Sequence, residues 1–438
     1  MTVVKQTLLE KIRNHTARVC VAGLGYVGLP FAVEKGKMGF HVVGVDNKQE
    51  RVDMVNRGIN FISDVKDDEL KDLVDRGLLS AVRSFEDAGD IDVLVIAVPT
   101  PLTKNLTPDL QSIENVTRLF APFVRRGQLI SLESTTYPGT TEEIMLPILE
   151  SGGLKAEKDF FVAHSPERVD PGNPHYTTKN TTKVVGGVGP ESLDVAYAFY
   201  SQTIEHVVPV SSAKAAELVK VFENTFRAVN IALVNELALL CDRMNLNVWE
   251  VLDAAFTKPF GIMPFYPGPG VGGHCIPLDP HYLEWKAKEL NFSTHFITLA
   301  GEINRMMPEF VRLKAWRVLN SFGVAPSQAK ILVMGVAYKK NLGDCRESPS
   351  IEILEMLVKD GVQVVYHDPF VSEFSQNAIS MQSQPLTQDL IERQHLVMIL
   401  TDHSNVDYTF LATHAAHILD TRNATRNVAV NRERITLL

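Results

Sequence analysis

The chain has 438 residues, enough for two or three domains with large buried cores. Hydrophobic residues make up 45% and charged residues 22%, as in an ordinary globular protein. The net charge of -9 argues against a general nucleic-acid binder, and four cysteines are too few for a disulfide framework. We expect a cytoplasmic protein without signal peptide or membrane helix, because the amino-terminal stretch is charged and no long apolar run occurs.

The amino-terminal stretch predicts a dinucleotide-binding turn. A strand over 18–22 leads into Gly23-Leu-Gly-Tyr-Val-Gly28 and a helix over about 27–38, and a second strand over 41–45 ends in Asp46. The glycines allow a tight turn, close approach of a pyrophosphate and close packing of helix on strand, and the helix amino terminus supplies amides. The alternative is a glycine-rich turn in an ordinary doubly wound sheet.

The acid at the end of the second strand indicates which dinucleotide binds. A carboxylate at Asp46 accepts hydrogen bonds from the adenosine ribose and disfavours the extra phosphate of NADP. We therefore expect NAD, with Arg51 near its adenosine end unless that arginine is only a solvated helix residue. The predicted cofactor-binding residues of this part are Gly23, Gly25, Tyr26, Val27, Gly28, Asp46 and Arg51.

Polar residues follow three further predicted strands. The strands span 92–98, 128–132 and 160–163, and they lead into Pro99-Thr100, Thr135 and Glu167. Ligands of open parallel sheets bind at the carboxyl ends of the strands. We therefore expect these residues to line one crevice beside the nicotinamide.

A long helix is predicted in the middle of the chain. Glycine and proline are absent between positions 210 and 258, and a serine at its start can cap a helix over about 212–245. Its length of roughly 50 Å exceeds what one domain needs, so we expect it to bridge two domains or form a dimer interface. Lys220 and Asn224 lie one turn apart on one face, although Lys220 alone is equally well explained as a solvated surface lysine.

The stretch 264–282 surrounds Cys275 with four glycines and five prolines. It predicts a shaped loop, because proline lacks an amide donor and glycine loses much entropy in regular structure. A cysteine in such a loop, four residues before Asp279, is expected to be a presented nucleophile. By contrast, we expect three other cysteines to be small apolar fillers, namely Cys20, Cys241 and Cys345.

A zinc site competes with this interpretation, because His274, Cys275, Asp279 and His281 lie close together in the chain. Structural zinc usually takes two spaced ligand pairs, and no second pair is present. The sequence therefore predicts no metal.

The carboxyl-terminal part repeats the alternating pattern without the glycine fingerprint. Its predicted elements are a strand over 329–337, a loop over 338–348, a helix over 349–359, a strand over 363–366 ending in Asp368, and strands over 396–400 and 417–419. Lys339, Lys340 and Arg346 make the loop suitable for a phosphate-bearing ligand, unless it is a solvated turn. The predicted fold class is α/β, with two Rossmann-like doubly wound domains joined by a long central helix.

A nicotinamide site together with a presented cysteine indicates an oxidation that passes through a thioester. A bare aldehyde carbon does not release hydride readily, but addition of a thiolate gives a thiohemiacetal from which hydride can leave. A simple alcohol dehydrogenase would not need Cys275.

Five motifs carry a resemblance to a known family: Gly23-Leu-Gly-Tyr-Val-Gly28, Ser165-Pro-Glu-Arg168, Glu217-Leu-Val-Lys-Val-Phe-Glu-Asn224, Gly272-Gly-His-Cys-Ile-Pro-Leu-Asp279 and Arg346-Glu-Ser348. The chain resembles the UDP-glucose/GDP-mannose dehydrogenases over essentially its whole length. The stretches 133–140 and 266–275 make it most similar to the UDP-N-acetylglucosamine 6-dehydrogenases. The resemblance implies oxidation of the sugar's sixth carbon to a uronate by two NAD molecules in turn, a product that commonly feeds surface polysaccharides, and a homodimer formed through the central helix.

The resemblance also implies roles for individual residues. Cys275 is the implied nucleophile, Lys220 the acid/base or oxyanion partner, Asn224 a donor to the tetrahedral intermediate, Asp279 a proton handler through water, and Glu167 the activator of water for thioester hydrolysis. The implied substrate contacts are Glu167, Lys220, Asn224, Tyr266, Gly272, Lys339 and Arg422, and the further cofactor contacts are Pro99, Thr100, Thr135 and Arg346. The implied domains are an NAD-binding domain at 1–210, a helical dimerisation region with the cysteine loop at 211–322, and a UDP-sugar-binding domain at 323–438.

Two departures from the family pattern bear on the substrate. The UDP-glucose branch has serine before its cysteine and lysine before its aspartate, where this chain has His274 and Leu278. The substrate therefore stays open between UDP-N-acetylglucosamine, UDP-N-acetylmannosamine, UDP-N-acetylgalactosamine, UDP-glucose and GDP-mannose. Two other classes also stay open: a non-catalytic nucleotide-sugar-binding protein and a zinc-dependent hydrolase using His274 and His281.

Overall fold

The structure is a computed structural model that describes residues 3–62, 65–103, 105–170, 173, 175–273, 276–376 and 379–438. The chain divides into two compact units. Unit 1 comprises Met1–Glu223 and His281–Phe292, and unit 2 comprises Asn224–Pro280 and Ser293–Leu438. Each unit is built on its own mainly parallel sheet.

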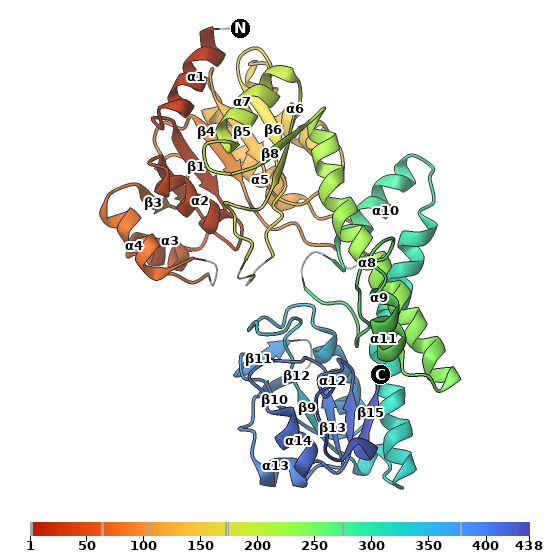
Figure 1. Ribbon diagram of the computed structural model, residues 1–438. Helices are drawn as coiled ribbons and strands as arrows, with labels where there is room; N and C mark the ends of the chain where they lie inside the picture. The colour runs from red at the N-terminus through yellow and green to blue at the C-terminus, as the bar shows by residue number, and fades with distance from the viewer. Residues whose placement is uncertain are drawn as a thin grey trace. The chain divides into compact units, whose positions relative to one another are not determined.

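Unit 1 contains an eight-stranded sheet with the order β3-β2-β1-β4-β5-β6-β7-β8 (Figure 1). Its strands are β1 (Arg18–Ala22), β2 (His41–Val45), β3 (Leu79–Val82), β4 (Val93–Ile96), β5 (Leu129–Leu132), β6 (Phe161–His164), β7 (Lys183–Gly187) and β8 (Val207–Val210). All neighbours pair in parallel except β6 and β7, which are antiparallel. The strand order reverses between β1 and β4, and ligands of doubly wound sheets bind at such a reversal.

Helices cover both faces of this sheet. They are α1 (Val3–Arg13), α2 (Gly28–Lys37), α3 (Gln49–Asn56), α4 (Asp67–Asp75), α5 (Gln111–Phe120), α6 (Leu146–Leu149) and α7 (Pro190–Tyr200), with the short turns η1 (Ala121–Phe123), η2 (Thr141–Met145) and η3 (Glu150–Gly152). Alternation along β1 builds the two cores: Val19 and Val21 pack with side chains of α1, α2, α4 and α7, whereas Cys20 and Ala22 pack with those of α5 and α6. This is the physical basis of the doubly wound arrangement.

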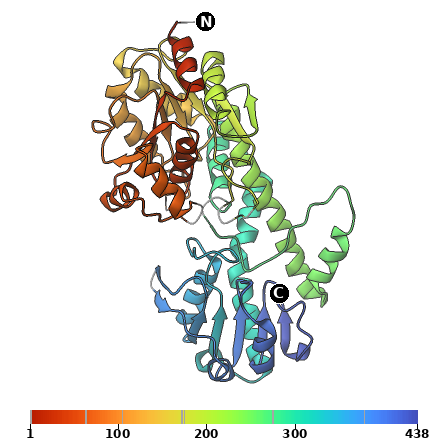
Figure 2. The ribbon, with the colours of Figure 1, turned by 60° about the vertical axis from the view of Figure 1, so that its left-hand side comes forward.

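The predicted long helix is confirmed as α8 (Ala213–Met244), which has 32 residues. The Oγ of Ser212 accepts the amide hydrogen of Ala215 at 3.1 Å and so caps its start. The helix begins in unit 1 and ends in unit 2, where α9 (Val248–Phe256) and α11 (His295–Ser321) pack against it (Figure 2). Between α8 and α11, the Nδ2 of Asn235 donates to the Oδ1 of Asn304 at 2.9 Å. The helix α10 (Asp279–Glu289) lies mostly in unit 1.

Unit 2 contains a five-stranded parallel sheet with the order β10-β9-β13-β14-β15. Its strands are β9 (Lys330–Met334), β10 (Gln363–His367), β13 (Leu396–Ile399), β14 (Ile418–Asp420) and β15 (Ile435–Leu437), beside an antiparallel hairpin of β11 (Glu373–Gln376) and β12 (Ile379–Gln382). Its helices are α12 (Pro349–Lys359), α13 (Gln388–Glu392) and α14 (Tyr408–His414), with the turns η4 (Pro326–Gln328) and η5 (Arg432–Arg434).

The predicted fold class is confirmed: two α/β sheets of Rossmann type, with a long helix between them in the chain. The sequence did not predict β3, β7 and β8, which extend the first sheet at both edges. Cys20 and Cys241 are buried as expected, whereas Cys345 is only partly buried. Within the described residues, no helix is long and apolar enough to cross a membrane.

Candidate functional site

The turn after β1 has the backbone that a dinucleotide site requires. Gly23 has a φ of +95°, in the region that favours glycine, and a Cβ on it would lie 2.5 Å from the carbonyl oxygen of Ala97. A Cβ on Gly28 would lie 1.9 Å from the carbonyl oxygen of Gly23. A Cβ on Gly25 would meet no protein atom within 4 Å, so the space beside it is open to a ligand.

Asp46 holds this turn from the end of β2. Its Oδ2 accepts the amide hydrogen of Leu24 at 2.9 Å, and its Oδ1 accepts that of Lys48 at 2.9 Å. The Nη1 of Arg51 lies 3.4 Å from the same Oδ2. A carboxylate has about four lone-pair positions, so acceptor capacity remains for a ribose hydroxyl. The turn and its acid thus fit NAD, whose chemical contribution when bound is to accept hydride.

Alanine at Gly25 and alanine at Gly28 are predicted to have different effects. Gly28→Ala places its Cβ against backbone, so we expect unit 1 to lose roughly 2–4 kcal/mol of stability. Gly25→Ala meets no protein atom and should leave the melting temperature unchanged, while its methyl group obstructs the pyrophosphate and weakens NAD binding about tenfold. Thermal melts and NAD titrations distinguish the two effects, and wild-type NAD affinity in Gly25→Ala would contradict this placement.

The strand ends after β4 and β5 are joined to each other. The Oγ1 of Thr100 donates to the carbonyl oxygen of Thr135 at 2.6 Å. The Oγ of Ser134 accepts the amide hydrogen of Val98 at 2.9 Å and donates to its carbonyl oxygen at 2.8 Å. The carbonyl oxygen of Thr100 also accepts a hydrogen bond from the hydroxyl of Tyr282. The structure therefore brings Thr100 and Thr135 together at the carboxyl edge of the sheet, as expected.

Glu167, after β6, is held at the same edge by contacts that the sequence did not reveal. Its Oε1 accepts the amide hydrogens of Arg168 at 2.7 Å and Val169 at 2.9 Å. Its Oε2 lies 3.1 Å from the Nζ of Lys183, which lies 3.2 Å from the Oε2 of Glu133. Lys183 begins a strand, and its sequence context carries no signal that distinguishes it from a solvated lysine.

The central helix carries two predicted catalytic residues. Lys220 is half-buried and makes no ion pair with any residue that the structure describes. Asn224 lies one turn further along α8, in unit 2, and is 5% exposed. Its Nδ2 donates to the Oδ2 of Asp279 at 2.5 Å, and Asp279 is 2% exposed. The structure thus places two of the predicted catalytic residues in direct contact.

The predicted nucleophile Cys275 and its neighbour His274 lie outside the described residues. The loop before them is described, and its glycines touch the carboxyl-terminal sheet within unit 2. A Cβ on Gly268 would lie 2.5 Å from the Nη1 of Arg422, and a Cβ on Gly272 or on Gly273 would lie 2.8 Å from Tyr338. The loop therefore lies against Arg422 and against Tyr338, the neighbour of Lys339, and the sequence predicts that Arg422 and Lys339 bind the UDP-sugar.

Those residues share one edge of the second sheet. Lys339 follows β9 and Arg422 follows β14, on either side of β13 in the sheet order. The Nε of Arg422 donates to the carbonyl oxygen of Leu400 at 2.9 Å, which orients the guanidinium. Because carboxyl ends of parallel strands form the ligand-binding edge of such sheets, this arrangement is suitable for a nucleotide phosphate.

Arg346, predicted to reach cofactor phosphates, lies on the loop before α12. Its Nε donates to both carboxylate oxygens of Asp344, at 2.9 and 3.0 Å, and its side chain is 43% exposed. Tyr266, predicted to contact substrate, donates its hydroxyl hydrogen to Asp253 at 2.8 Å and stacks on Trp249. Both side chains are therefore oriented by unit 2 itself.

The acid at the end of β10 differs from Asp46 in its role. The Oδ2 of Asp368 accepts the amide hydrogens of Val336 at 2.8 Å and Ala337 at 3.0 Å, and it lies 3.1 Å from the Nε2 of His403. Asp368 is 3% exposed and closes the turn after β9. The second sheet thus has an acid in the same place as Asp46, and this acid serves a structural role in a sheet that lacks the glycine fingerprint.

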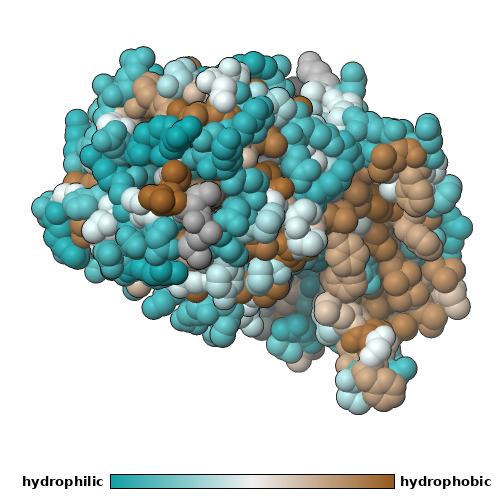
Figure 3. All heavy atoms as spheres, turned by 90° about the horizontal axis from the view of Figure 1, so that it is seen from above, coloured by the Kyte–Doolittle hydropathy of each residue, from teal (hydrophilic) through white to brown (hydrophobic). Residues whose placement is uncertain are grey.

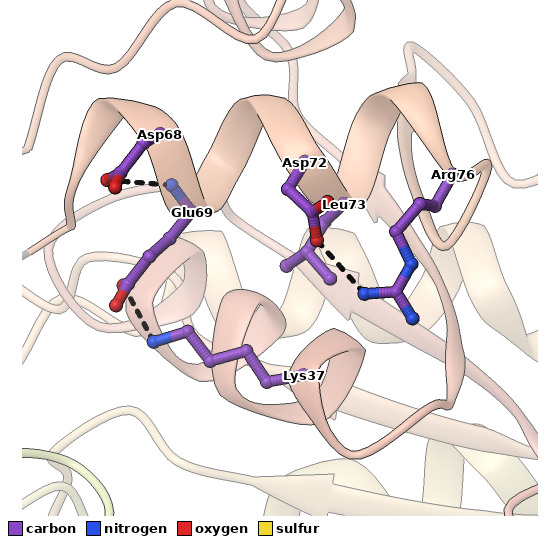
Figure 4. Close-up of a pocket in the computed structure, with 6 residues that line it drawn as sticks. All are labelled: Lys37, Asp68, Glu69, Asp72, Leu73 and Arg76. Carbon is purple, nitrogen blue, oxygen red and sulfur yellow. Dashed lines mark hydrogen bonds and ion pairs between the residues drawn. The ribbon is translucent and has the colours of Figure 1, made fainter.

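One open pocket lies on the outer surface of unit 1, between α2 and α4 (Figure 4). It is lined by Lys37, Asp68, Glu69, Asp72, Leu73 and Arg76. Lys37 lies 2.6 Å from Glu69, and Arg76 lies 2.9 Å from Asp72. Because these charges are paired with one another and none belongs to the predicted site, the pocket is a feature of the helix surface. Among the described residues, no group of three His, Cys, Asp or Glu could hold a metal ion.

Three stretches of the chain match models of one protein family. Residues 17–204 match the NAD binding domain, residues 214–306 the central domain and residues 332–427 the UDP binding domain of the UDP-glucose/GDP-mannose dehydrogenase family. The last match indicates a UDP-sugar substrate.

Relatives in other organisms match most of the chain. A UDP-N-acetyl-D-mannosamine dehydrogenase of Pyrococcus horikoshii is 35% identical over 93% of this chain and 95% of its own length. A UDP-N-acetyl-D-glucosamine 6-dehydrogenase of Pseudomonas aeruginosa is 37% identical over 81% of this chain and 83% of its own.

Solved structures agree with the sequence relatives. The structure of UDP-D-ManNAc dehydrogenase from Pyrococcus horikoshii matches with a TM-score of 0.84 and 34% identity, over 93% of this chain and 96% of that one. The NDP-N-acetyl-D-galactosaminuronic acid dehydrogenase of Methanosarcina mazei matches with a TM-score of 0.83 and 29% identity, over 100% of this chain and 98% of that one. The chain therefore belongs to the UDP-glucose/GDP-mannose dehydrogenase family and is an NAD-dependent nucleotide-sugar dehydrogenase.

Proposed function

We propose that the protein oxidises the sixth carbon of a UDP-N-acetylhexosamine to the uronate through a thioester on Cys275. The observation that carries the proposal is the buried contact between Asn224 and Asp279. The Asp279 carboxylate fixes the orientation of the Asn224 amide, and Asp279 lies four residues after Cys275 in the chain. Acyl chemistry requires an oriented donor of this kind for the oxygen that becomes negative.

The proposed reaction balances as follows. One primary alcohol and one water give a carboxylate, two hydrides and three protons. After the first hydride has left, the thiolate of Cys275 adds to the aldehyde carbon and forms a C–S bond. Loss of the second hydride gives the thioester, and attack of water breaks the C–S bond and returns the thiolate.

The described residues have distinct proposed roles in these steps. Lys220 receives the proton of the alcohol or stabilises the oxygen that becomes negative, and Asn224 donates to the same oxygen. Glu167 takes a proton from the attacking water, and Asp279 exchanges protons through water. In unit 2, Lys339 and Arg422 bind the UDP phosphates, and Tyr266 and Gly272 contact the sugar nucleotide. NAD is held in unit 1 by the turn at 23–28 with Asp46 and Arg51, and by the strand ends at Pro99, Thr100 and Thr135. Arg346 has a proposed contact with the NAD phosphates.

For the sugar itself we propose UDP-N-acetylglucosamine, on the motifs at 133–140 and 266–275. UDP-N-acetylmannosamine is the second candidate, because a relative named as a UDP-N-acetyl-D-mannosamine dehydrogenase matches 93% of the chain. Both candidates carry an acetamido group, so the proposed substrate class is the UDP-N-acetylhexosamines. A cytoplasmic location, as predicted from the sequence, is part of the proposal.

The test is the NADH formed with a panel of UDP- and GDP-sugars, counted per sugar consumed. We expect two NADH per sugar and a preference for UDP-N-acetylglucosamine. Two NADH with a preference for another acetamido sugar would correct the epimer and keep the chemistry. One NADH per sugar would mean that the reaction stops at the aldehyde, and the thioester would then be wrong.

We also propose that the protein is a homodimer formed through the central helices. In the proposed division of the chain into domains, 1–210 binds NAD, 211–322 forms the dimer and 323–438 binds the UDP-sugar. An apolar surface is visible on the right of Figure 3. Large apolar side chains are exposed on α8, α9, α11 and the segment 257–263 of unit 2, namely Phe226, Leu233, Leu240, Met244, Val251, Phe260, Ile262, Met263, Phe296, Leu299 and Met306. Apolar patches of this extent usually mark an interaction surface.

Substitution on this surface tests the dimer. Leu233 lies on α8 and is 63% exposed, so Leu233→Asp adds a charge without disturbing the core. We expect light scattering to give twice the chain mass for the wild type and a shift toward the chain mass for Leu233→Asp. Glu236→Ala, on an exposed position of the same helix, is the control and should remain dimeric. A wild-type protein of single-chain mass would refute the proposal.

A further inference from the structure

A buried lysine lies between two carboxylates at the carboxyl edge of the first sheet. The Nζ of Lys183 is 3.2 Å from the Oε2 of Glu133 and 3.1 Å from the Oε2 of Glu167. The side chains of Lys183 and Glu133 are 4% and 0% exposed, and that of Glu167 is 15% exposed. The cluster therefore reaches solvent mainly through Glu167, the member with a proposed role in the reaction.

The topology explains how these three residues meet. Glu133 follows β5 and Glu167 follows β6, so both lie where those parallel strands end. Strand β7 runs antiparallel to β6, with Gly186 opposite His164, so its first residue, Lys183, extends past the end of β6. Because β7 is antiparallel to β6, the ammonium group of Lys183 lies at the edge of the sheet where ligands bind.

The Glu167 carboxylate is held at both oxygens. Its Oε1 accepts the amide hydrogens of Arg168 and Val169, and Lys183 contacts its Oε2. These contacts leave acceptor capacity on a carboxylate, which has about four lone-pair positions. Burial alone would raise the pKa of Glu167, but the charge of Lys183 and the two amides together hold that pKa below its ordinary value.

Other charged and titratable groups surround the cluster from four elements: His164 of β6, Tyr200 of α7, Lys35 of α2, and Arg168 with its partner Glu223 of α8. Burial and the charge of Lys183 lower the pKa of His164 to about 3, so it is neutral. Burial raises the pKa of Tyr200, which is therefore also neutral.

The two other cations are directed elsewhere. The Nζ of Lys35 donates to the carbonyl oxygen of Phe199 at 2.6 Å, and burial lowers the pKa of Lys35. The guanidinium of Arg168 binds Glu223 and the carbonyl oxygen of Thr182. Among the described residues, Lys183 is thus the cationic side chain in contact with the Glu167 carboxylate.

We propose that Lys183 is a positioning residue for the reaction: it holds the Glu167 carboxylate in place and ionised, and Glu133 anchors its ammonium group. The inference rests on the proposed function, in which Glu167 accepts the proton of the water that attacks the thioester. The bond that breaks is C–S, the thiolate of Cys275 leaves, and the proton passes to Glu167. Lys183 contributes no atom to these steps.

The test compares Lys183→Met with Lys183→Arg, which keeps the charge. In Lys183→Met, burial remains and the cation is lost, so Glu167 should become protonated at higher pH. We expect the acid limb of the kcat–pH profile to move up by at least about one pH unit. We also expect kcat at neutral pH to fall by roughly 10–100-fold, because the Glu167 carboxylate is no longer held in place by the ammonium group. In Lys183→Arg the acid limb of the kcat–pH profile should lie where it does in the wild type. The KM for the sugar nucleotide should change little in either variant.

Rapid mixing supplies a second readout. Because water attack follows both hydride transfers, Lys183→Met should release two NADH per subunit quickly and then turn over slowly. A purely structural role would instead lower the size of this burst and leave the acid limb in place. That result, or an unchanged limb with a full burst, would overturn the proposal.

Glu133→Gln is the matched control, because it removes the charge at the far end of the cluster and leaves Lys183. The acid limb of the kcat–pH profile of Glu133→Gln should not move to higher pH, because Glu167 then loses the repulsion of a neighbouring carboxylate. Should Lys183→Met fail to fold, the double variant Lys183→Met/Glu133→Gln removes cation and counter-charge together and should still show the raised limb. Failure of the proposed function is distinguishable, because it would appear in the wild type as fewer than two NADH per sugar.

Discussion

Cys275→Ser should abolish uronate formation while leaving NAD and sugar-nucleotide binding largely intact. Serine is nearly isosteric, but its hydroxyl is a far weaker nucleophile than a thiolate, so no thiohemiacetal forms. We expect the rate of NADH formation with the preferred sugar to fall by on the order of 10³-fold or more. Binding titrations with NAD and the UDP-sugar, made on the same preparation, should remain within about threefold of wild type.

Cys241→Ser is the matched control for this prediction. Cys241 packs in the apolar cluster between α8 and α9 and is 3% exposed, so its replacement should cost some stability and leave turnover near wild type. Normal turnover by Cys275→Ser would refute the thioester mechanism. Equal losses in both variants would mean that the effect comes from folding.

Glu217→Ala should destabilise unit 1 more than any surface change on the same helix. Glu217 is 1% exposed, and its carboxylate accepts the amide hydrogens of Gly139 at 2.5 Å and Thr141 at 2.8 Å, and the hydroxyl hydrogen of Thr141 at 2.7 Å. Alanine leaves these buried donors without an acceptor, at a cost of roughly 3–5 kcal/mol. We expect a fall in melting temperature of roughly 10 °C.

The same variant should also weaken NAD binding, because the segment that Glu217 holds begins four residues after Thr135 in the chain. Glu236→Ala, at an exposed position of α8, is the control and should change the melting temperature by less than about 2 °C. If Glu217→Ala melts like the control, then water satisfies the exposed donors and the contact contributes little to stability.

The pH dependence of stability gives an independent check on Glu217. Burial raises its pKa from 4.5 to about 7 despite the three donors. The folded protein therefore keeps this proton to a higher pH than the unfolded chain does, so the stability contributed by the group is full below pH 4.5 and is lost as the pH rises to about 7. Glu217→Gln does not titrate, so melting temperatures of the two proteins should diverge across this window, with the wild type losing more.

Local sequence patterns were sufficient to predict the nucleotide turn, the central helix and the loop over 264–273, but the expectation of a loop as far as 282 was wrong, because α10 begins at Asp279. In each case the determining residues are close in the chain: the three glycines of 23–28 with Asp46 a strand later, a serine cap followed by a run without glycine or proline, and the glycines and prolines of 264–282. Such patterns act through backbone freedom and short-range hydrogen bonds, which do not depend on where the rest of the chain lies.

Contacts between distant residues were decided only by the tertiary structure. Lys183 looks like a solvated lysine in the sequence, and it is buried because β7 reverses direction and brings it beside Glu133 and Glu167. Gly268 looks like a loop glycine, and the structure places it against Arg422, far along the chain, whose Nη1 would lie 2.5 Å from a Cβ on Gly268. The reason is the same in both cases: strand order and strand direction determine which charges meet in the interior, and neither is encoded in a local stretch of residues.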